Sequence, residues 1–205
     1  MIPSSERLSR QIAFVLELDK LKTVLRQTLL LDSSRFENDA EHSWHVAVMA
    51  MVLAEHAPPG IDIGRVAQML LLHDVVEIDA GDTFIHDEAG AADKEARETA
   101  AADRLYGLLP ADQAAGLRAL WEEFEAKESP EARFADALDR LQPILHNVAT
   151  EGETWKRHGV TADKVLRLAG RIDRGAPALG AYARALVTEA VRRGYLAPAP
   201  DGLTG

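Results

Sequence analysis

Residues 69–77 read Met-Leu-Leu-Leu-His-Asp-Val-Val-Glu, which puts His73 and Asp74 side by side at the end of an apolar run. A run this apolar is typical of a helix in the interior of a protein. Burying an imidazole and a carboxylate without partners would carry a large desolvation cost. The two side chains therefore either bind a metal ion or satisfy each other, and a dipeptide alone does not decide between these alternatives.

The composition is that of an acidic, ordinary globular protein without cysteine. The chain has 205 residues, of which 47% are hydrophobic and 27% charged, and this length suits a single domain. The formal net charge of -10 argues against a nucleic-acid polymer as partner, because such partners need a basic surface. Without cysteine, any metal ion must be held by nitrogen and oxygen atoms. No apolar stretch is long enough for a membrane span and residues 1–10 lack the apolar core of a signal peptide, so we expect a cytoplasmic protein.

Apolar residues recur at helical spacing along most of the chain, which predicts an all-α bundle of about seven to nine helices. We find no convincing strand, no hairpin signal and no internal repeat. One helix is expected over 12–29, a nearly all-apolar one over 62–80, and two closing helices over 161–171 and 177–193. Helix start signals are present as a capping box at Asn38 and Glu41, as Asp62, and as Ser129-Pro130-Glu131.

Ionisable residues gather on the same predicted helices. Glu77 follows His73 by four residues and Asp74 by three, and these spacings place all three on one helical face. Asp82 follows in the turn after that helix, and His42 lies in the first turn of an earlier one. Several ionisable groups near the end of a buried helix are hard to explain as a solvated face.

Two further carboxylates share a later helix. Asp136 and Asp139 lie three residues apart on an otherwise apolar stretch, and either could instead form a salt bridge with Arg133 or Arg140. Combined with His42, His73 and Asp74, one of them would give two imidazoles and two carboxylates. Such a set is a plausible shell for Mn, Co, Fe, Ni or Zn, with room for water.

The order His42, His73-Asp74, Asp139 on an all-helical chain resembles the HD-domain metal-dependent phosphohydrolases. The similarity extends from about Leu21 to about Asn147. Within this range, five segments resemble one branch of the family, which contains the bacterial 5′-deoxynucleotidases and their eukaryotic relatives. These segments are 41–43, 73–77, 81–82, 120–124 and 131–134.

The resemblance implies a set of metal ligands and a single ion. One divalent metal ion (Mn, Co, Fe, Ni, Zn or Mg) would be bound by His42, His73, Asp74 and Asp139. The block over 131–134 sets the register that selects Asp139 over Asp136 as the last ligand.

The resemblance also implies the roles of three further residues. Glu77 would help to activate water or to protonate, and Asp82 would position the substrate or the water. Arg26, near the end of the first predicted helix, would bind phosphate. The branch often has a tryptophan shortly after this arginine, but here residues 27–29 read Gln-Thr-Leu, which questions selectivity for deoxyribose and not the hydrolysis. Apart from the resemblance, Arg35, just before the Asn38 cap, is a weaker phosphate candidate.

These roles describe a metal-dependent phosphomonoesterase, a 5′-nucleotidase that acts on (deoxy)nucleoside monophosphates. A bound metal ion lowers the pKa of its water from about 16 toward about 7 and neutralises charge on a phosphoryl oxygen. The alternatives are another HD phosphohydrolase, acting on a nucleoside triphosphate, a cyclic dinucleotide or an alarmone, and a non-catalytic metal- or nucleotide-binding protein. The cyclic dinucleotide type carries extra histidines and a Gly-Tyr-Pro signature, and neither is visible here.

We expect one HD domain over residues 1–205, with a core of about 21–150. The C-terminal helices within 161–195 would pack on that core or at a dimer interface, and a homodimer is expected because it is the commonest assembly. Among the other histidines, His45 is expected on a packed helix face, His146 in the core or near the surface, and His86 in a loop that could touch substrate.

Overall fold

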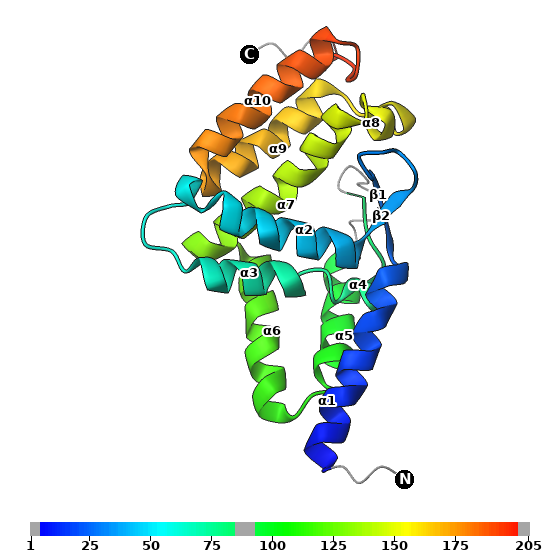
Figure 1. Cartoon of the computed structure of the whole chain (residues 1–205), viewed down its shortest axis with the longest axis vertical. Coiled ribbons are helices and arrows are strands. Elements are labelled where there is room, and N and C mark those ends of the chain that lie inside the picture. The colour runs from blue at the N-terminus through cyan, green and yellow to red at the C-terminus, as the bar shows by residue number, and fades with distance from the viewer. Residues whose placement is uncertain (1–4, 85–92, 201–205) are drawn as a thin grey trace.

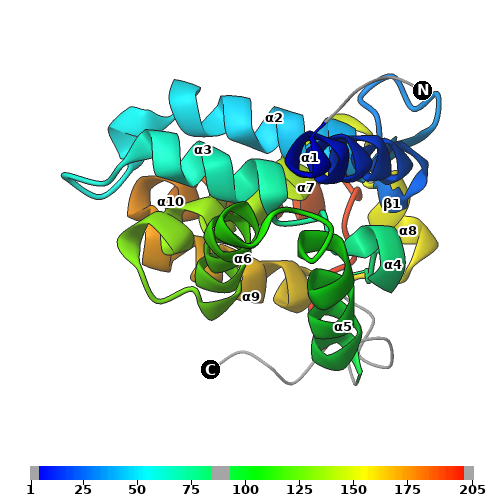
Figure 2. The same cartoon turned by 90° about the horizontal axis from the view of Figure 1, so that it is seen from below.

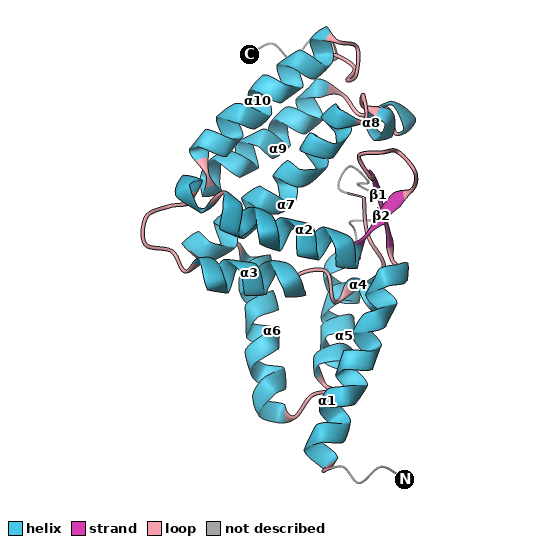
Figure 3. Cartoon of the chain, in the orientation of Figure 1, coloured by secondary structure: helices cyan, strands magenta, loops and turns pink. Residues whose placement is uncertain are grey.

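The structure, a computed structural model, describes residues 5–84 and 93–200. His86 therefore lies outside the described residues. The all-α prediction is confirmed, since eight helices of the described chain have ten or more residues (Figure 3). These eight helices are α1 (Glu6–Glu17), α2 (Asp39–Val52), α3 (Ile63–Leu72), α5 (Lys94–Tyr106), α6 (Ala111–Ala126), α7 (Pro130–Ala149), α9 (Ala162–Gly175) and α10 (Pro177–Arg192).

Figure 1 shows α7, α9 and α10 stacked at one end of the molecule and α1, α5 and α6 extending to the other, with α2 and α3 between them. Seen from below in Figure 2, α2 and α3 lie next to each other with α1 at their end, and α5 lies on the opposite side of the molecule. Shorter helical pieces connect these layers. They are η1 (Leu18–Thr23), η2 (Ala54–His56), α4 (Glu77–Ala80) and α8 (Glu153–Arg157), of which α8 was not predicted.

The largest hydrophobic core surrounds α7. Phe134 and Leu138 of α7 are fully buried there, together with Leu70 of α3 and Ile172 of α9. Leu179 of α10 joins the same core, so the C-terminal helices bury their apolar faces against the rest of the chain. A second, smaller cluster lies between α1, α5 and α6 and includes Phe14, Leu105, Tyr106 and Trp121.

The predicted helix starts are confirmed by the caps. The side chain of Asn38 accepts a hydrogen bond from the Glu41 amide while the Glu41 side chain accepts one from the Asn38 amide. Asp62 caps α3 and Ser129 caps α7 through the same kind of side-chain bond. These bonds satisfy amides that have no partner inside the helix, and each contributes roughly 1 kcal/mol.

The prediction of one helix over 12–29 and of no strand was wrong. After α1 and η1 the chain becomes strand β1 (Leu25–Leu29), which pairs antiparallel with β2 (Phe36–Asn38). The turn between them includes Ser33 with a positive φ of 56°. Leucines at 21, 25 and 29 fit helical spacing, but Leu29 is buried and Leu25 is exposed, so tertiary packing overrode the local pattern.

The helix predicted over 62–80 is interrupted. α3 ends at Leu72, and α4 begins at Glu77. Between them the amide of Val75 donates to the Leu72 carbonyl and the amide of Glu77 to the Asp74 carbonyl, at 3.1 Å and 2.9 Å. These three-residue spacings are tighter than those of an α-helix. The residues of the opening motif therefore sit at a junction between helices, and His73, Asp74 and Glu77 do not share one continuous helix face.

Within the part of the chain that the structure describes, no helix has the length and apolar character needed to cross a membrane.

The packing around α7 predicts the stability of two matched variants. Leu138 is fully buried and Leu31 is 59% exposed. Truncation of Leu138 to alanine should lower the free energy of unfolding by about 2–5 kcal/mol, because it removes buried methyl groups and leaves a cavity. Leu31→Ala should change it by less than about 0.5 kcal/mol. Urea unfolding followed by circular dichroism measures both, and equal losses would contradict the assignment of α7 to the core.

Candidate active site

The first turn of α2 positions His42. The capping box at Asn38 and Glu41 fixes where the helix begins, and Arg35 holds Glu41 from outside through an exposed ion pair. His42, four residues after the cap, is completely buried and directed toward α7. The helix start thus fixes the position at which the His42 side chain enters the interior.

The junction between α3 and α4 positions the second histidine. Nδ1 of His73 donates a hydrogen bond to the carbonyl oxygen of Leu70 at 2.7 Å. This bond assigns the lone pair of a neutral imidazole to Nε2. Nε2 is buried without a hydrogen-bond partner, 3.1 Å from Oδ1 of Asp74 and 3.7 Å from Oδ1 of Asp139.

The structure brings together the four side chains expected to form the metal shell. Nε2 of His42 lies 2.9 Å from Oδ1 of Asp139 and 4.0 Å from Oδ2 of Asp74. The imidazole rings of His42 and His73 are 5.4 Å apart between centroids. Three separate segments, namely α2, the 73–76 junction and α7, therefore contribute to one cluster.

Of the two aspartates on α7, Asp139 faces the histidines. Asp136 instead accepts hydrogen bonds from Arg171 at 3.0 Å and Arg140 at 3.3 Å. The salt bridge considered for Asp136 is thus present, and the one considered for Asp139 is a longer contact of 3.5 Å to Arg140. Asp136 and Asp139, three residues apart on α7, therefore have different surroundings.

The cluster fits a divalent metal ion. One candidate donor atom each from His42, His73 and Asp139 lies within 4.8 Å of the others. The buried Nε2 atom of His73 has no hydrogen-bond partner among the described residues, and a metal ion would supply one. Nitrogen and oxygen donors of this kind suit a borderline or hard divalent ion.

Arg26 lies beside the cluster, but on β1 and not at the end of a helix as predicted. Its Nη1 donates to Oδ2 of Asp74 at 2.8 Å and to Oδ1 of Asp39 at 3.2 Å. Its side chain is only 13% exposed. Although burial opposes a charged guanidinium, the surrounding carboxylates of Asp74, Asp82 and Asp139 keep the pKa of Arg26 raised. The strand thus delivers a permanent positive charge to a group of acids.

The acids around Arg26 lie close enough to one another to influence each other's protonation. Asp39, Glu77 and Asp82 each offer a carboxylate oxygen within 4.8 Å of the other two. Burial, with the charge of Asp74 nearby, raises the pKa of Asp39 to about 7 and that of Glu77 well above its usual range. Burial also raises the pKa of Asp82, with Arg26 opposing it. At least one carboxyl of this group is therefore able to hold a proton near neutral pH.

His42 and Asp139, two of the metal-shell candidates, influence each other's pKa. Burial alone would raise the pKa of Asp139, but Arg140, the hydrogen bond from His42 and the nearby His73 ring lower it well below its usual range. Burial and Arg26 oppose the charged form of His42, and hydrogen bonds to Asp139 and Glu37 overcome them and raise its pKa to about 9.

A pocket opens beside these residues. Lys94 and Arg140 add positive charge to its wall, and Phe124 and Trp155 add aromatic surface. The sequence did not identify these residues or Asp39 as parts of a site, because each occupies an ordinary position in a helix pattern. Trp155 is notable because the tryptophan expected shortly after Arg26 is absent from the sequence. The pocket lining also includes Gln27, His73, Asp74, Glu77, Asp82, Asp139, Ile144, Asn147 and Leu168.

Other candidates lie elsewhere. The exposed ion pair of Arg35 with Glu41 places it outside the pocket lining. His45 and His146 contact each other, with ring centroids 5.4 Å apart, and do not join His42 and His73. His146 is buried, one of the two positions expected for it.

Comparison with known proteins gives a consistent family. A sequence model of the HD domain matches residues 18–180. Human 5′-deoxynucleotidase HDDC2 is 35% identical over 111 residues, which cover 54% of this chain and 53% of that protein. The Xenopus laevis protein of the same name is 32% identical over 135 residues, covering 66% and 65%. The chain thus spans about half the length of the first of these curated relatives.

A solved structure extends the comparison to the whole fold. The crystal structure of a protein from Magnetospirillum magnetotacticum MS-1, titled a "Predicted metal-dependent phosphohydrolase", is 70% identical and superimposes with a TM-score of 0.92. The match covers 97% of this chain and 100% of that one. The PH0347 protein from Pyrococcus horikoshii OT3, 20% identical with a TM-score of 0.59 over 89% of this chain and 99% of its own, shares the fold.

The charge arrangement predicts unequal effects for two arginine variants. Arg26 contacts buried carboxylates, whereas Arg35 and Glu41 have side chains 52% and 38% exposed. In metal-depleted protein, Arg26→Met should lower the free energy of unfolding by about 3–5 kcal/mol, because it leaves buried carboxylates unpaired. Arg35→Met should cost at most about 1 kcal/mol. Chemical denaturation in the presence of a chelator compares them, and similar losses would contradict the role given to Arg26.

Proposed function

Because the chain belongs to the HD-domain family, we propose that it is a metal-dependent phosphohydrolase that releases phosphate from nucleoside and deoxynucleoside 5′-monophosphates. The observation that carries this proposal is the convergence of His42, His73, Asp74 and Asp139 beside a pocket that contains Arg26. The names of the relatives, 5′-deoxynucleotidase and metal-dependent phosphohydrolase, support it. The substrate is a small nucleotide and not a nucleic-acid polymer.

In this proposal one divalent ion binds to Nε2 of His42 and His73 and to carboxylate oxygens of Asp74 and Asp139. The candidates are Mn, Co, Fe, Ni, Zn and Mg. When bound, such an ion polarises a phosphoryl oxygen and activates water. The hydrogen bond from His73 Nδ1 to Leu70 supports this assignment, because it aims the free lone pair of His73 into the cluster.

The remaining groups of the pocket orient the reactants and move a proton. Arg26 holds nonbridging phosphate oxygens with a planar set of N–H donors. Glu77 donates a proton to the departing sugar oxygen or orients the water, and Asp82 positions the substrate or the water. The raised pKa values of Glu77 and Asp82 support these roles, because a carboxyl that keeps its proton near neutrality is able to act as an acid. Asp39, which shares Arg26 with Asp74, belongs to the same acid group.

A phosphate-release screen tests the proposed function. Metal-depleted protein is supplied with Mn, Co, Mg or Zn and with ribo- and deoxyribonucleoside mono-, di- and triphosphates. We expect release from monophosphates, reduced at least about 100-fold in His73→Ala and in Asp74→Ala, because each loses a ligand to the charge that stabilises the transition state. Circular dichroism should show that both variants remain folded.

The same screen distinguishes the alternatives. Release from triphosphates or an alarmone alone would identify a different HD phosphohydrolase. Absence of release with every metal, despite one bound ion per chain, would identify a non-catalytic binding protein.

We further propose that residues 1–205 form one domain, with a core of about 21–150, and that two copies form a homodimer. The outer face of α2 supports the second part, since Trp44, Met51 and Val52 are 63%, 60% and 70% exposed and lie seven and eight residues apart, on one side of the helix. Exposed apolar side chains gathered on one face are typical of an interface. The cytoplasmic location stays a prediction.

The dimer face gives a separate prediction. Trp44→Glu places a charge in the proposed interface and should convert the dimer to a monomer in light scattering coupled to gel filtration. Leu166→Glu, on α9 and 41% exposed, is the matched control and should leave the dimer intact. A wild-type monomer, or a Trp44→Glu dimer of unchanged affinity, would contradict the proposal.

A further inference from the structure

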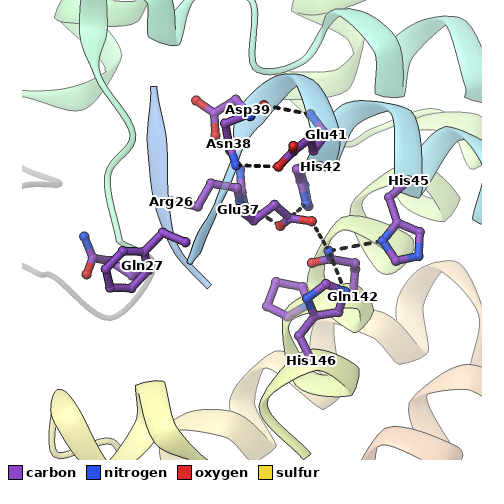
Figure 4. Close-up of polar contacts among 12 residues, drawn as sticks. Arg26, Gln27, Glu37, Asn38, Asp39, Glu41, His42, His45, Gln142 and His146 are labelled. Atoms are coloured by element: carbon purple, nitrogen blue, oxygen red, sulfur yellow. Dashed lines mark hydrogen bonds and ion pairs between the residues drawn. The ribbon is translucent and has the colours of Figure 1, made fainter. Parts of the chain in front are cut away.

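A second polar cluster lies inside the protein, next to the metal-shell candidates and unused by the function proposed above (Figure 4). We call it the Gln142 hub, and it consists of Glu37, His45, Gln142 and His146. Glu37 comes from β2, His45 from α2 and the other two from α7. Glu37, Gln142 and His146 are 2%, 0% and 4% exposed, so their polar atoms depend on one another for hydrogen bonds.

The amide nitrogen of Gln142 organises this hub. It donates to Oε1 of Glu37 at 2.7 Å and to Nε2 of His146 at 3.1 Å, and it lies 3.5 Å from Nδ1 of His45. His146 is able to accept because its Nδ1 donates to the Leu29 carbonyl at 3.0 Å. The amide thus occupies the point on which the three acceptors converge. A second metal ion would have to displace it, so we interpret the hub as a hydrogen-bond network.

The other carboxylate oxygen of Glu37 faces the metal-shell candidates. Oε2 lies 3.5 Å from Nδ1 of His42 and 3.9 Å from Nε of Arg26. These two nitrogens and Oε2 itself are buried, and none of the three has a hydrogen-bond partner at ordinary distance among the described residues, so the carboxylate is the acceptor that faces both nitrogens. Glu37 therefore connects a fully buried amide on one side with a buried imidazole and guanidinium on the other.

We propose that Glu37 is a positioning residue, which holds the His42 imidazole with its proton on Nδ1 and its Nε2 lone pair directed into the metal site. Gln142 and His146 hold the Glu37 carboxylate in place. The inference rests on the proposed function, because that function assigns Nε2 of His42 to a metal ion.

The reason lies in the competition for one imidazole proton. A neutral imidazole carries its proton on one nitrogen and accepts through the other. Asp139 accepts from Nε2 of His42 at 2.9 Å, so the Asp139 carboxylate favours a proton on the nitrogen that must be free for a metal ion. The Glu37 carboxylate at Nδ1 opposes this preference. Outer carboxylates of this kind typically change metal affinity by about 10–100-fold.

Two readouts test the inference, with four variants. Glu37→Leu removes the acceptor, Glu37→Gln keeps one acceptor oxygen, and Gln142→Leu removes the bond that holds Glu37. Val187→Ala, buried on α10 outside the site and hub, is the control for general loss of stability. Melting temperatures identify variants whose stability loss exceeds that of the control.

The first readout is the affinity of metal-depleted protein for Co²⁺ or Mn²⁺ by calorimetry. Glu37→Leu should weaken binding about 10–100-fold, Glu37→Gln and Gln142→Leu less, and Val187→Ala not at all. The second readout is the position of the single proton on the His42 ring, from long-range ¹⁵N–¹H correlation spectra of metal-free protein recorded at a pH above the raised His42 pKa of about 9, where the ring is neutral. Nδ1 should carry a proton in the wild type and lose it to Nε2 in Glu37→Leu.

The outcomes separate the two proposals. An unchanged His42 spectrum in Glu37→Leu would overturn the positioning role, as would affinity losses that follow the melting temperature and not the Glu37 substitution. Two ions per wild-type chain with one lost in Glu37→Gln would also overturn it, since Glu37 would then be a ligand itself. A wild type that binds no metal and releases no phosphate would refute the proposed function, while the metal-free spectra would still test Glu37.

Discussion

The arrangement of the site depends on one buried guanidinium. Arg26 lies within 4.0 Å of carboxylate oxygens of Glu37, Asp39, Asp74 and Asp139. Burying these acids without compensation would cost several kcal/mol per unpaired ion. Four carboxylates meet one guanidinium here, so a proton on Asp39, a charged His42 or a bound cation has to offset the remaining negative charge. The same charge balance ties the short hairpin to the helices, because Arg26 is supplied by β1.

Strand β1 and the break between α3 and α4, the two departures from regular helix, both help to place charged groups around Arg26. If residues 25–29 continued the first helix, Arg26 would not extend alongside β2 toward the acids. If α3 continued through residue 77, the i to i+4 bond would engage the 70 carbonyl that now accepts from the His73 ring. The break at 73–76 leaves that carbonyl to fix the ring and turns Asp74 toward Arg26. A fold built from regular helices thus places its chemistry where regularity ends.

The sequence predicted the helices whose signals were local and missed the features set by distant partners. Caps at Asn38 and Ser129 were predictable because a helix start depends on a few neighbouring residues. Strand β1 was missed because leucine spacing alone fits a helix. The cluster of His42, His73 and Asp139 followed from the resemblance, since no local pattern states which helices meet. Glu37 carries no such signal, because Gln142, the residue that holds its carboxylate, lies 105 residues away on α7.

Helix α7 links the proposed metal site to the hub. Asp139, Gln142 and His146 follow one another at spacings of three and four residues, and so lie on one face of that helix. Pro143 stands among them and has no amide proton, so the carbonyl of Asp139 lacks its usual helical partner. The other side of the helix carries Ala137 and Leu141 in the main core. Core packing therefore sets the position of α7. That position in turn sets where Asp139 lies relative to Gln142, which holds the Glu37 carboxylate beside His42. In this fold the stability of the core and the geometry of the site are consequences of the same helix.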